Sequence, residues 1–205
     1  GFHWNRENKK PFLPVSEDFH AWNAGNVQST AGSPLIVGDS LYFYVSGRYN
    51  SKPKHDSNFA TGLAMLRRDG FVSMRAGRKE GYIEIKTQIP ANGNYLFVNA
   101  DVKGTLAVEV LDDNGQPMEG FTKKDCISMK KSDKTKQMIS WEKHPGVTSL
   151  VGKTVRLKFY LNQADIYAFW ISAWQTGESG GYTGGGGPGL SDEGIDTPMD
   201  KLKNN

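Results

Sequence analysis

Apolar residues in this chain occur in short runs, most of which end at a turn-forming residue. At residues 82–87 and 155–159, apolar and charged positions alternate, as they do in a strand that buries one face and exposes the other. The runs are rich in β-branched and aromatic residues, and none has the 3.6-residue period of an amphipathic helix. We therefore predict an all-β protein with no substantial helix.

The pattern places ten strands along the chain. They are expected at residues 34–37, 40–46, 62–67, 71–74, 81–87, 95–102, 105–111, 137–141, 154–161 and 166–174. Turns are expected at Gly38-Asp39, Lys103-Gly104 and Asn114-Gly115, because glycine and asparagine tolerate the positive φ of tight hairpins. Strands that alternate in this way form sheets with one buried face, which favours a β-sandwich.

The composition divides the 205 residues into three segments. Residues 1–69 are rich in loops, aromatics and amides, and residues 70–176 contain the regular strands. Residues 177–205 include a glycine-rich run that is typical of a linker or tail. We expect this tail to be docked against the body of the protein.

Charge and cysteine content exclude several functional classes. The 25 basic and 22 acidic residues give a net charge of +3, and no apolar stretch approaches the ~20 residues of a membrane-spanning helix. The only cysteine, Cys126, cannot form an internal disulfide or a cysteine-based zinc site. We expect neither a nucleic-acid nor a membrane partner, and interpret the densest basic cluster as a solvated loop: Lys123, Lys124, Lys130, Lys131, Lys134 and Lys136, interrupted by Asp125 and Asp133.

No metal or cofactor site is expected either. The four histidines are scattered, without the i, i+4 spacing of a helical metal pair. Residues 112–115 carry oxygen ligands but not the spaced acidic positions of a calcium loop, so they are interpreted as a turn.

Two blocks of sequence resemble a known family. Residues 1–6 (GFHWNR), 11–14 (PFLP), 22–29 and 41–48 resemble the last blade of a five-bladed β-propeller in bacterial proteins similar to glycoside hydrolase family 32. Residues 61–74, 96–102, 108–112 and 152–159 are similar to the β-sandwich that follows the propeller in those proteins. The resemblance implies a concanavalin-A-like, jelly-roll β-sandwich preceded by a partial propeller blade.

Length bears on this resemblance. Five blades of ~40–50 residues would use the whole chain and leave none for a sandwich. We therefore expect a C-terminal part of a longer protein that lacks its N-terminal propeller domain, with Gly1 as a cloning remnant. The exposed edges of a lone blade would favour self-association. Because such proteins are usually exported, a secreted or periplasmic location is expected.

The resemblance implies that the catalytic carboxylates lie upstream, so no catalytic residue is expected here. Adjacent Glu17 and Asp18 do not span the ~5–9 Å gap between the two carboxyl groups of a glycosidase. Sugar contact is the more plausible chemistry, since sugars are held by aromatic faces and amides. The candidate contacts are His3, Trp4, Arg6, Trp22, Asn23, Asn26, Gln28 and Trp141. The alternative is that the tryptophans fill a core and the amides cap turns.

Three functions follow as hypotheses. The first is a non-catalytic accessory region of a glycoside hydrolase-like protein, which supports the propeller and contacts carbohydrate. The second is a free-standing carbohydrate-binding, lectin-like module. The third is a structural interaction domain without a ligand.

Overall fold

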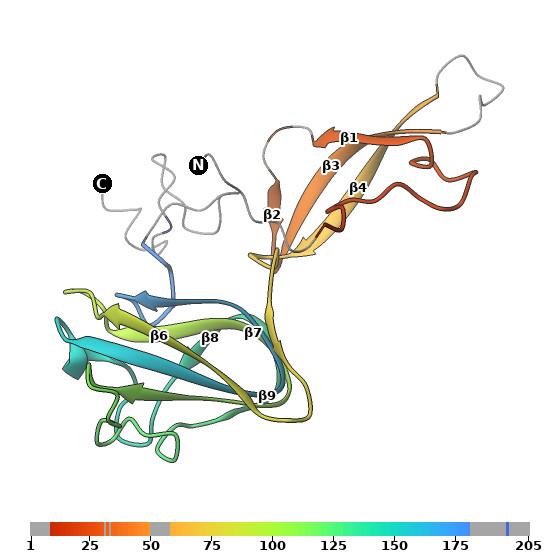
Figure 1. Ribbon diagram of the computed structural model, residues 1–205. Helices are drawn as coiled ribbons and strands as arrows, with labels where there is room; N and C mark the ends of the chain where they lie inside the picture. Colours follow the sequence, from red (N-terminus) through yellow and green to blue (C-terminus); the bar gives the residue numbers. More distant parts are fainter. Residues whose placement is uncertain (1–8, 31, 33, 50–57, 181–195, 197–205) are drawn as a thin grey trace, which may run out of the picture. The chain divides into compact units, whose positions relative to one another are not determined.

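The computed structural model describes residues 9–30, 32, 34–49, 58–180 and 196 (Figure 1). Within these residues the chain forms nine strands and one short 3-10 turn, η1 (Thr148–Leu150), so the prediction of an all-β protein without substantial helix is confirmed. The chain divides into two compact units, Gly1–Met65 and Leu66–Asn205. The division lies close to the predicted boundary at residue 70. Whether the folds are a propeller blade and a jelly roll stays a prediction.

The first unit is built on a four-stranded antiparallel sheet. Its strands are β1 (Asn26–Thr30), β2 (Leu35–Val37), β3 (Ser40–Arg48) and β4 (Phe59–Arg67), whose last two residues belong to the second unit. The central strand β3 pairs with β1 and β2 along one edge and with β4 on the other. The sequence pattern missed β1, because this strand has only one apolar residue, Val27, among polar ones.

One face of this sheet is covered by the segment that precedes it. Leu41, Phe43 and Val45 of β3 are buried on that face. The ring of Phe12 meets that of Phe43 edge-on, with centroids 5.6 Å apart. An aromatic pair of this geometry adds stabilisation beyond its buried area, so the segment before β1 packs on the buried residues of β3.

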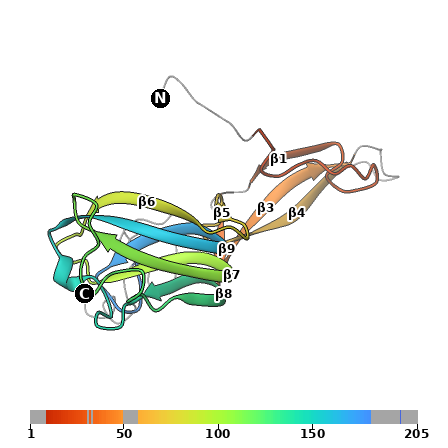
Figure 2. The same ribbon diagram turned by 60° about the horizontal axis from the view of Figure 1, so that its bottom comes forward.

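The second unit is a strongly curled five-stranded antiparallel sheet. Its strands are β5 (Met74–Ala76), β6 (Gly81–Gln88), β7 (Tyr95–Leu111), β8 (Met129–Ile139) and β9 (Thr154–Ser172). The strand order is β5-β9-β7-β8. Strands β5 and β6 share one edge of β9, where β5 pairs with residues 164–166 and β6 with residues 154–161. Figure 2 shows the long strands β7 and β9 side by side between β6 and β8.

The long strands explain two of the sequence predictions. The segments predicted at 95–102 and 105–111 form one strand, β7. The segments predicted at 154–161 and 166–174 both belong to β9, which ends at Ser172. The turn predicted at Lys103-Gly104 is wrong, because these residues lie within β7 at a shift in register. A Cβ on Gly104 would lie 2.3 Å from the Asn162 carbonyl oxygen, so glycine lets the two strands approach where the sheet bends.

The predicted basic loop is also wrong in part. Lys130, Lys131, Lys134 and Lys136 belong to β8, an edge strand whose lysine side chains are exposed. Lysines on an edge strand hide the alternation on which strand prediction depends, and they discourage pairing with other sheets.

The core of the second unit lies on the concave face of the curled sheet. Phe159 and Leu157 of β9 pack with Val108 of β7, and all three are fully buried. Trp141, 1% exposed, closes this core: its indole N–H donates to the Val108 carbonyl oxygen at 3.0 Å, and Phe121 packs edge-on against its ring at 5.1 Å.

Replacing Trp141 by alanine should destabilise the second unit by about 3–5 kcal/mol, because the change leaves a cavity and an unpaired Val108 carbonyl. Chemical denaturation followed by circular dichroism measures the loss. The control is Ile127→Ala, at a side chain that is 60% exposed, which should change the free energy of unfolding by less than about 0.5 kcal/mol. Equal effects of the two substitutions would contradict the assignment of Trp141 to the core.

Candidate functional site

Trp22 lies on the covered face of the first sheet. A Cβ on Gly47 of β3 would fall 2.4 Å from its ring, and one on Gly62 of β4 would fall 2.2 Å from it. Because the two glycines lack side chains, the indole packs directly against the backbone of two neighbouring strands. Trp22 is half-buried, so one side of its ring packs against backbone and is not available to a sugar.

A series of tight turns holds Trp22 in place. The Asp18 carboxylate accepts from the His20 N–H at 3.0 Å, and the Asp18 carbonyl accepts from the Ala21 N–H at 3.0 Å. Asn23 donates its side-chain amide to the Pro14 carbonyl at 3.3 Å. Two of the candidate sugar contacts, Trp22 and Asn23, thus have structural partners of the kind that the alternative interpretation expects.

Asn26 and Gln28 are exposed on β1. Asn26 pairs with Arg48 of β3, whose guanidinium stacks on Phe59 at 4.5 Å. Trp22 contacts Gly47, the residue next to Arg48 on β3, and Gly62 of β4. Alternate residues of a strand face opposite sides of the sheet. The structure therefore places Asn26 and Trp22 on opposite faces. Gln28 lies at a shift in register between β1 and β3.

The remaining candidates do not join these residues. Trp141 is buried in the core of the second unit, so its ring offers no face to a ligand. His3, Trp4 and Arg6 lie outside the described residues. Among the described candidates, only the amides of Asn26 and Gln28 are presented to solvent on a strand.

The opposite face of the first sheet is apolar and exposed. Leu35 and Val37 of β2 pair with Tyr42 and Ser40 of β3, so they share the face away from Trp22. Six large side chains on this face are each 45% to 67% exposed: Leu35, Val37, Tyr44, Phe59, Leu63 and Met65. Phe59, Thr61, Leu63 and Met65 lie on one face of β4. Because the residues between them are also mostly apolar, the sequence could not show which face of the strand is buried.

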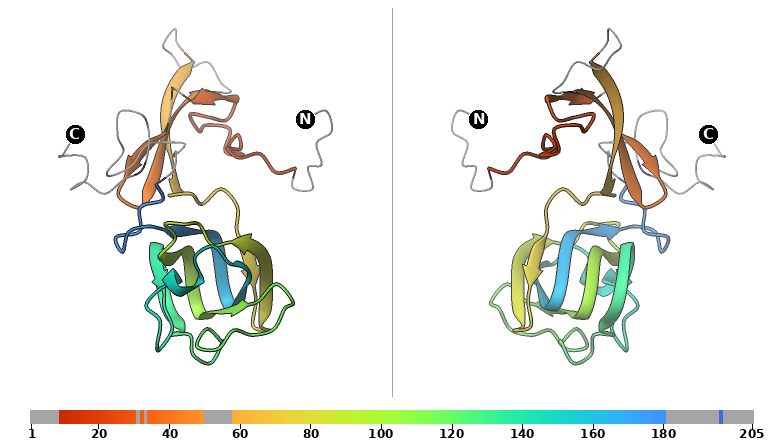
Figure 3. Two further views of the ribbon diagram at one scale, coloured as in Figure 1. Left: turned by 90° about the vertical axis from the view of Figure 1, so that its left-hand side faces the viewer. Right: turned by 90° about the vertical axis from the view of Figure 1, so that its right-hand side faces the viewer.

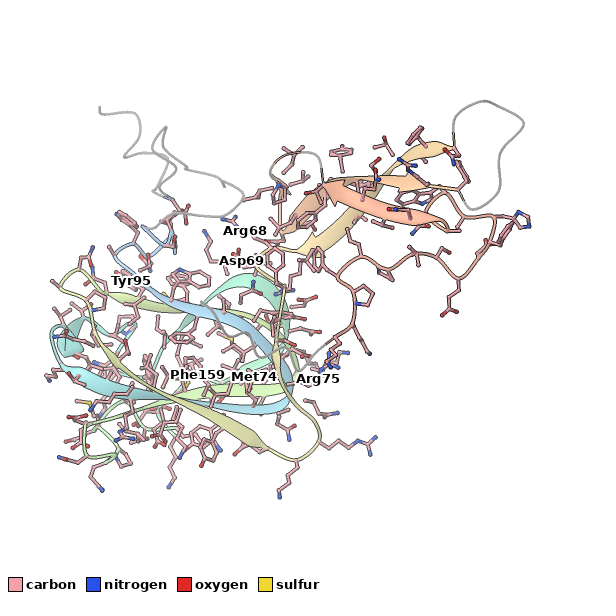
Figure 4. All side chains as sticks on the ribbon, turned by 45° about the horizontal axis from the view of Figure 1, so that its top comes forward. Arg68, Asp69, Met74, Arg75, Tyr95 and Phe159 are labelled. Carbon is pink, nitrogen blue, oxygen red and sulfur yellow. The ribbon has the colours of Figure 1, made fainter. Side chains whose placement is uncertain are left out.

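The second unit has an apolar hollow on its concave side. Met74 of β5, Ile83 and Ile85 of β6, and Phe159 and Phe169 of β9 line it, and its volume is about 150 Å³. Met74 and Phe159 are labelled in Figure 4. Pockets for small molecules usually enclose ~300–1,000 Å³ and include convergent polar groups. This hollow therefore accommodates an apolar side chain more readily than a sugar.

Aspartates form a row across the convex face of the second sheet. Asp133, Asp101 and Asp165 are direct neighbours on β8, β7 and β9. Like charges that face each other across strands destabilise a sheet. Arg67 neutralises Asp133, and Arg75, labelled in Figure 4, donates to Asp165 at 2.8 Å. No group of residues able to hold a metal ion is found in the part of the chain that the structure describes.

Asp165 remains ionised in this row. Burial opposes its ionisation, but hydrogen bonds from Arg75 and from Ser73, at 2.9 Å, outweigh that effect and hold its pKa below the ordinary value. A carboxylate held in this way is a structural charge rather than a proton donor near neutral pH.

Arg67 ties the end of β4 to the convex face. Its guanidinium donates to the Asn99 side-chain oxygen at 2.6 Å and to the Ala100 carbonyl at 3.2 Å, and it lies 4.9 Å from the Tyr167 ring centroid. Asn99, which is 1% exposed, donates in turn to the Arg68 carbonyl at 2.6 Å. Arg67 was not among the residues predicted from the sequence to be functional, although it ends an apolar strand directly before a turn.

A second cluster on this face combines tyrosines and charges. The Tyr160 hydroxyl donates to Glu109 at 2.7 Å, and the Lys123 ammonium lies 4.2 Å from the Tyr160 ring centroid. Burial, together with the hydrogen bond and the negative charge of Glu109, raises the pKa of Tyr160 to about 12. Tyr160 is therefore a protonated donor, not a candidate base.

The segment after β9 also packs on the convex face. Phe97 and Trp170 stack with centroids 5.7 Å apart, and the Trp170 indole donates to the Gly177 carbonyl at 2.9 Å. Ser179 N–H donates to the Asp196 carboxylate at 2.8 Å. The described residues of the predicted tail thus contact the sheet at Gly177 and each other at Ser179 and Asp196.

Substituting Arg67 by methionine should lower the free energy of unfolding by about 2–3 kcal/mol, because buried Asn99 loses its donor and Asp133 its counter-charge. Urea denaturation gives the difference. Arg78→Met, at an exposed arginine, is the control and should cost less than about 0.5 kcal/mol. A loss at Arg67 no larger than at Arg78 would show that these contacts do not hold the segment.

Replacing Glu109 by glutamine should lower the pKa of Tyr160 from about 12 toward the ordinary value of 10, as ¹³C NMR titration of the ring would show. Because the folded-state pKa lies above the unfolded one, the stability linked to Tyr160 is complete below about pH 10 and is lost as the pH rises toward 12. Glu119→Gln, at an exposed site, should leave the titration unchanged. An unaltered Tyr160 titration in Glu109→Gln would exclude this cause.

Comparisons of the chain with protein-family models, with curated proteins and with solved structures found no match. In the described part of the chain, no helix is long and apolar enough to cross a membrane.

Proposed function

We propose that this chain is a non-catalytic accessory region of a longer glycoside hydrolase-like protein, in which the first sheet packs against a further β-sheet. The observation that supports this is the apolar face of Leu35, Val37, Tyr44, Phe59, Leu63 and Met65. The sheets of a propeller are covered by neighbours on both faces. In this chain, Phe12 and Trp22 cover one face of the first sheet, and the other face carries the exposed apolar side chains.

On this proposal, the second unit supports the neighbouring propeller domain. Its core is closed by Trp141 and Phe121, and its ion pairs and aromatic clusters on the convex face are satisfied internally. Such a unit is suited to bracing a neighbouring domain. The proposed carbohydrate contact lies on β1, at the edge of the first sheet, where Asn26 and Gln28 present amide groups that hydrogen-bond sugar hydroxyls. It requires the further sheet to leave this edge uncovered.

The apolar face is tested with the paired substitution Leu63→Ser and Met65→Ser. In this chain the pair should change the free energy of unfolding by less than about 1 kcal/mol, because both side chains are largely exposed. In the protein made from the complete reading frame the same pair should cost about 2–4 kcal/mol, because burial of each side chain is lost. Val72→Ser, at a 74% exposed residue of the second unit, is the control. Equal costs in the two proteins would contradict the packing.

The absence of catalysis and the presence of sugar contact are tested separately. Purified chain should not hydrolyse fructan, arabinan or galactan oligosaccharides, and measurable turnover would overturn the accessory role. Calorimetric titration with the same oligosaccharides should give weak binding that is lost in Asn26→Ala with Gln28→Ala and kept in Gln88→Ala, an exposed amide of the second unit. Retained binding in the double variant would remove β1 from the site.

A further inference from the structure

The second sheet has two free edges, β8 and β6. Each of these strands pairs with a single neighbour among the described strands, β7 and β9 respectively, and Figure 3 shows β6 as the outermost strand on its side of the sheet. A free edge presents unpaired backbone N–H and C=O groups, which form a template for another strand. The two edges differ in the charges that they present to an added strand.

The β8 edge is protected. Exposed Lys130, Lys131, Lys134 and Lys136 follow one another along it, and its only acidic residue, Asp133, is neutralised by Arg67. A second copy of β8 would bring lysines against lysines, which is a usual defence against pairing between edges. This edge is therefore closed to another copy of the chain.

The β6 edge has no such barrier. Its pairing with β9 runs without a shift in register from Gly81 to Gln88. Ile89, the next residue, donates its N–H toward β9, to the Lys153 carbonyl at 3.0 Å. Because backbone groups of an antiparallel strand point alternately to its two sides, those of Tyr82, Glu84 and Lys86 point away from β9. This edge offers hydrogen bonds and carries charges of both signs.

We propose that β6 pairs in an antiparallel manner with β6 of a second copy of this chain, in the register that places Glu84 opposite Lys86. A twofold axis then passes between the Ile85 residues of the two copies, and both Glu84–Lys86 pairs form at once. A shift by two residues toward either side would place Glu84 opposite Glu84 or Lys86 opposite Lys86. A shift by one residue would place apolar side chains on the polar face. Charge complementarity thus selects one register.

The concave side of β6 fits the same arrangement. Ile83 and Ile85 are half-buried and line the apolar hollow with Met74 and Phe159. In the proposed register Ile85 meets Ile85 of the second copy, and Ile83 meets Thr87. The second strand therefore extends the apolar concave surface of each sheet. On the convex side, Glu84 keeps its contact with Arg156, at 3.0 Å, and Lys86 its contact with Asp113.

Sedimentation equilibrium tests the association. The wild-type mass should rise from 22.7 kDa toward twice that value with concentration. Lys86→Glu and Glu84→Lys should each weaken dimerisation on the order of tenfold or more, because two attractive pairs become repulsive. An equimolar mixture of the two variants should regain dimerisation as a heterodimer, since each variant then faces the opposite charges. Lys134→Glu, on β8, is the matched control and should dimerise like the wild type.

A cysteine placed on the twofold axis tests the register itself. Ile85→Cys should form a disulfide-linked dimer under mild oxidation, because residues opposite each other at a non-hydrogen-bonded position have Cα atoms ~4.5 Å apart, within the range of a disulfide. Ile83→Cys, at an equally half-buried position, faces Thr87 and should not cross-link. The native Cys126 is buried and does not interfere.

Three results would overturn the proposal: a wild-type chain that stays monomeric at all concentrations, dimerisation that Lys86→Glu leaves unchanged, or cross-linking of Ile83→Cys as readily as Ile85→Cys. If Glu84→Lys fails to fold beside Arg156, then Lys86→Glu and the cysteine pair decide the question. Loss of association in the Leu63→Ser, Met65→Ser pair with no loss in Lys86→Glu would assign the contact to the first sheet instead. The outcome is independent of the accessory role proposed above.

Discussion

The pairing of β7 with β9 is the interaction on which the second unit depends. These two strands stay hydrogen-bonded from Tyr95 opposite Ser172 to Leu111 opposite Arg156, through shifts in register that bend the sheet. Because the strands pass through the bend together, the concave residues of both halves, such as Val98 and Leu157, enter one core. Gly104 at the bend allows the close approach of Asn162 that this geometry needs. The loop residues Phe121 and Trp141 then seal the core.

The arrangement of the strands also determines which edges of the second sheet lack a neighbouring strand. Since β5 and β6 share one edge of β9 and β8 lies on the far side of β7, the sheet has two edges with different charge patterns. On β8, four lysines and an Asp133 that is already paired with Arg67 disfavour self-pairing. On β6, Glu84 and Lys86 alternate with Ile83 and Ile85, so charge and apolar character are both self-complementary. The same fold thus excludes association at one edge and permits it at the other.

The all-β class and most strands could be predicted from the sequence, because residues 81–87 and 154–161 alternate cleanly between apolar and polar positions. The continuity of β7 and β9 could not, since Lys103-Gly104 has the composition of a hairpin turn and only its contact with Asn162 makes it a bend. Only the end of strand β8 was predicted, within the segment 137–141, because the lysines of its first part mask the buried residues Met129 and Thr135. Of the candidate site, the exposure of Asn26 and Gln28 follows from their polar side chains on an edge strand, whereas the burial of Trp141 depends on a distant strand through the Val108 carbonyl.

The two units differ in the surfaces that their sheets expose. In the second unit, buried Asn99 and Asp165 have hydrogen-bond partners, and the Tyr160 hydroxyl is paired with the Glu109 carboxylate. Among the described residues of the first unit, one face of the four-stranded sheet is covered, and the other face exposes six large apolar side chains. Contiguous apolar surface of this kind marks an interaction site on a folded protein. On the proposed accessory role, a partner gains most from the first sheet and the second unit acts as a preformed support, while the proposed β6 pairing adds a self-complementary edge.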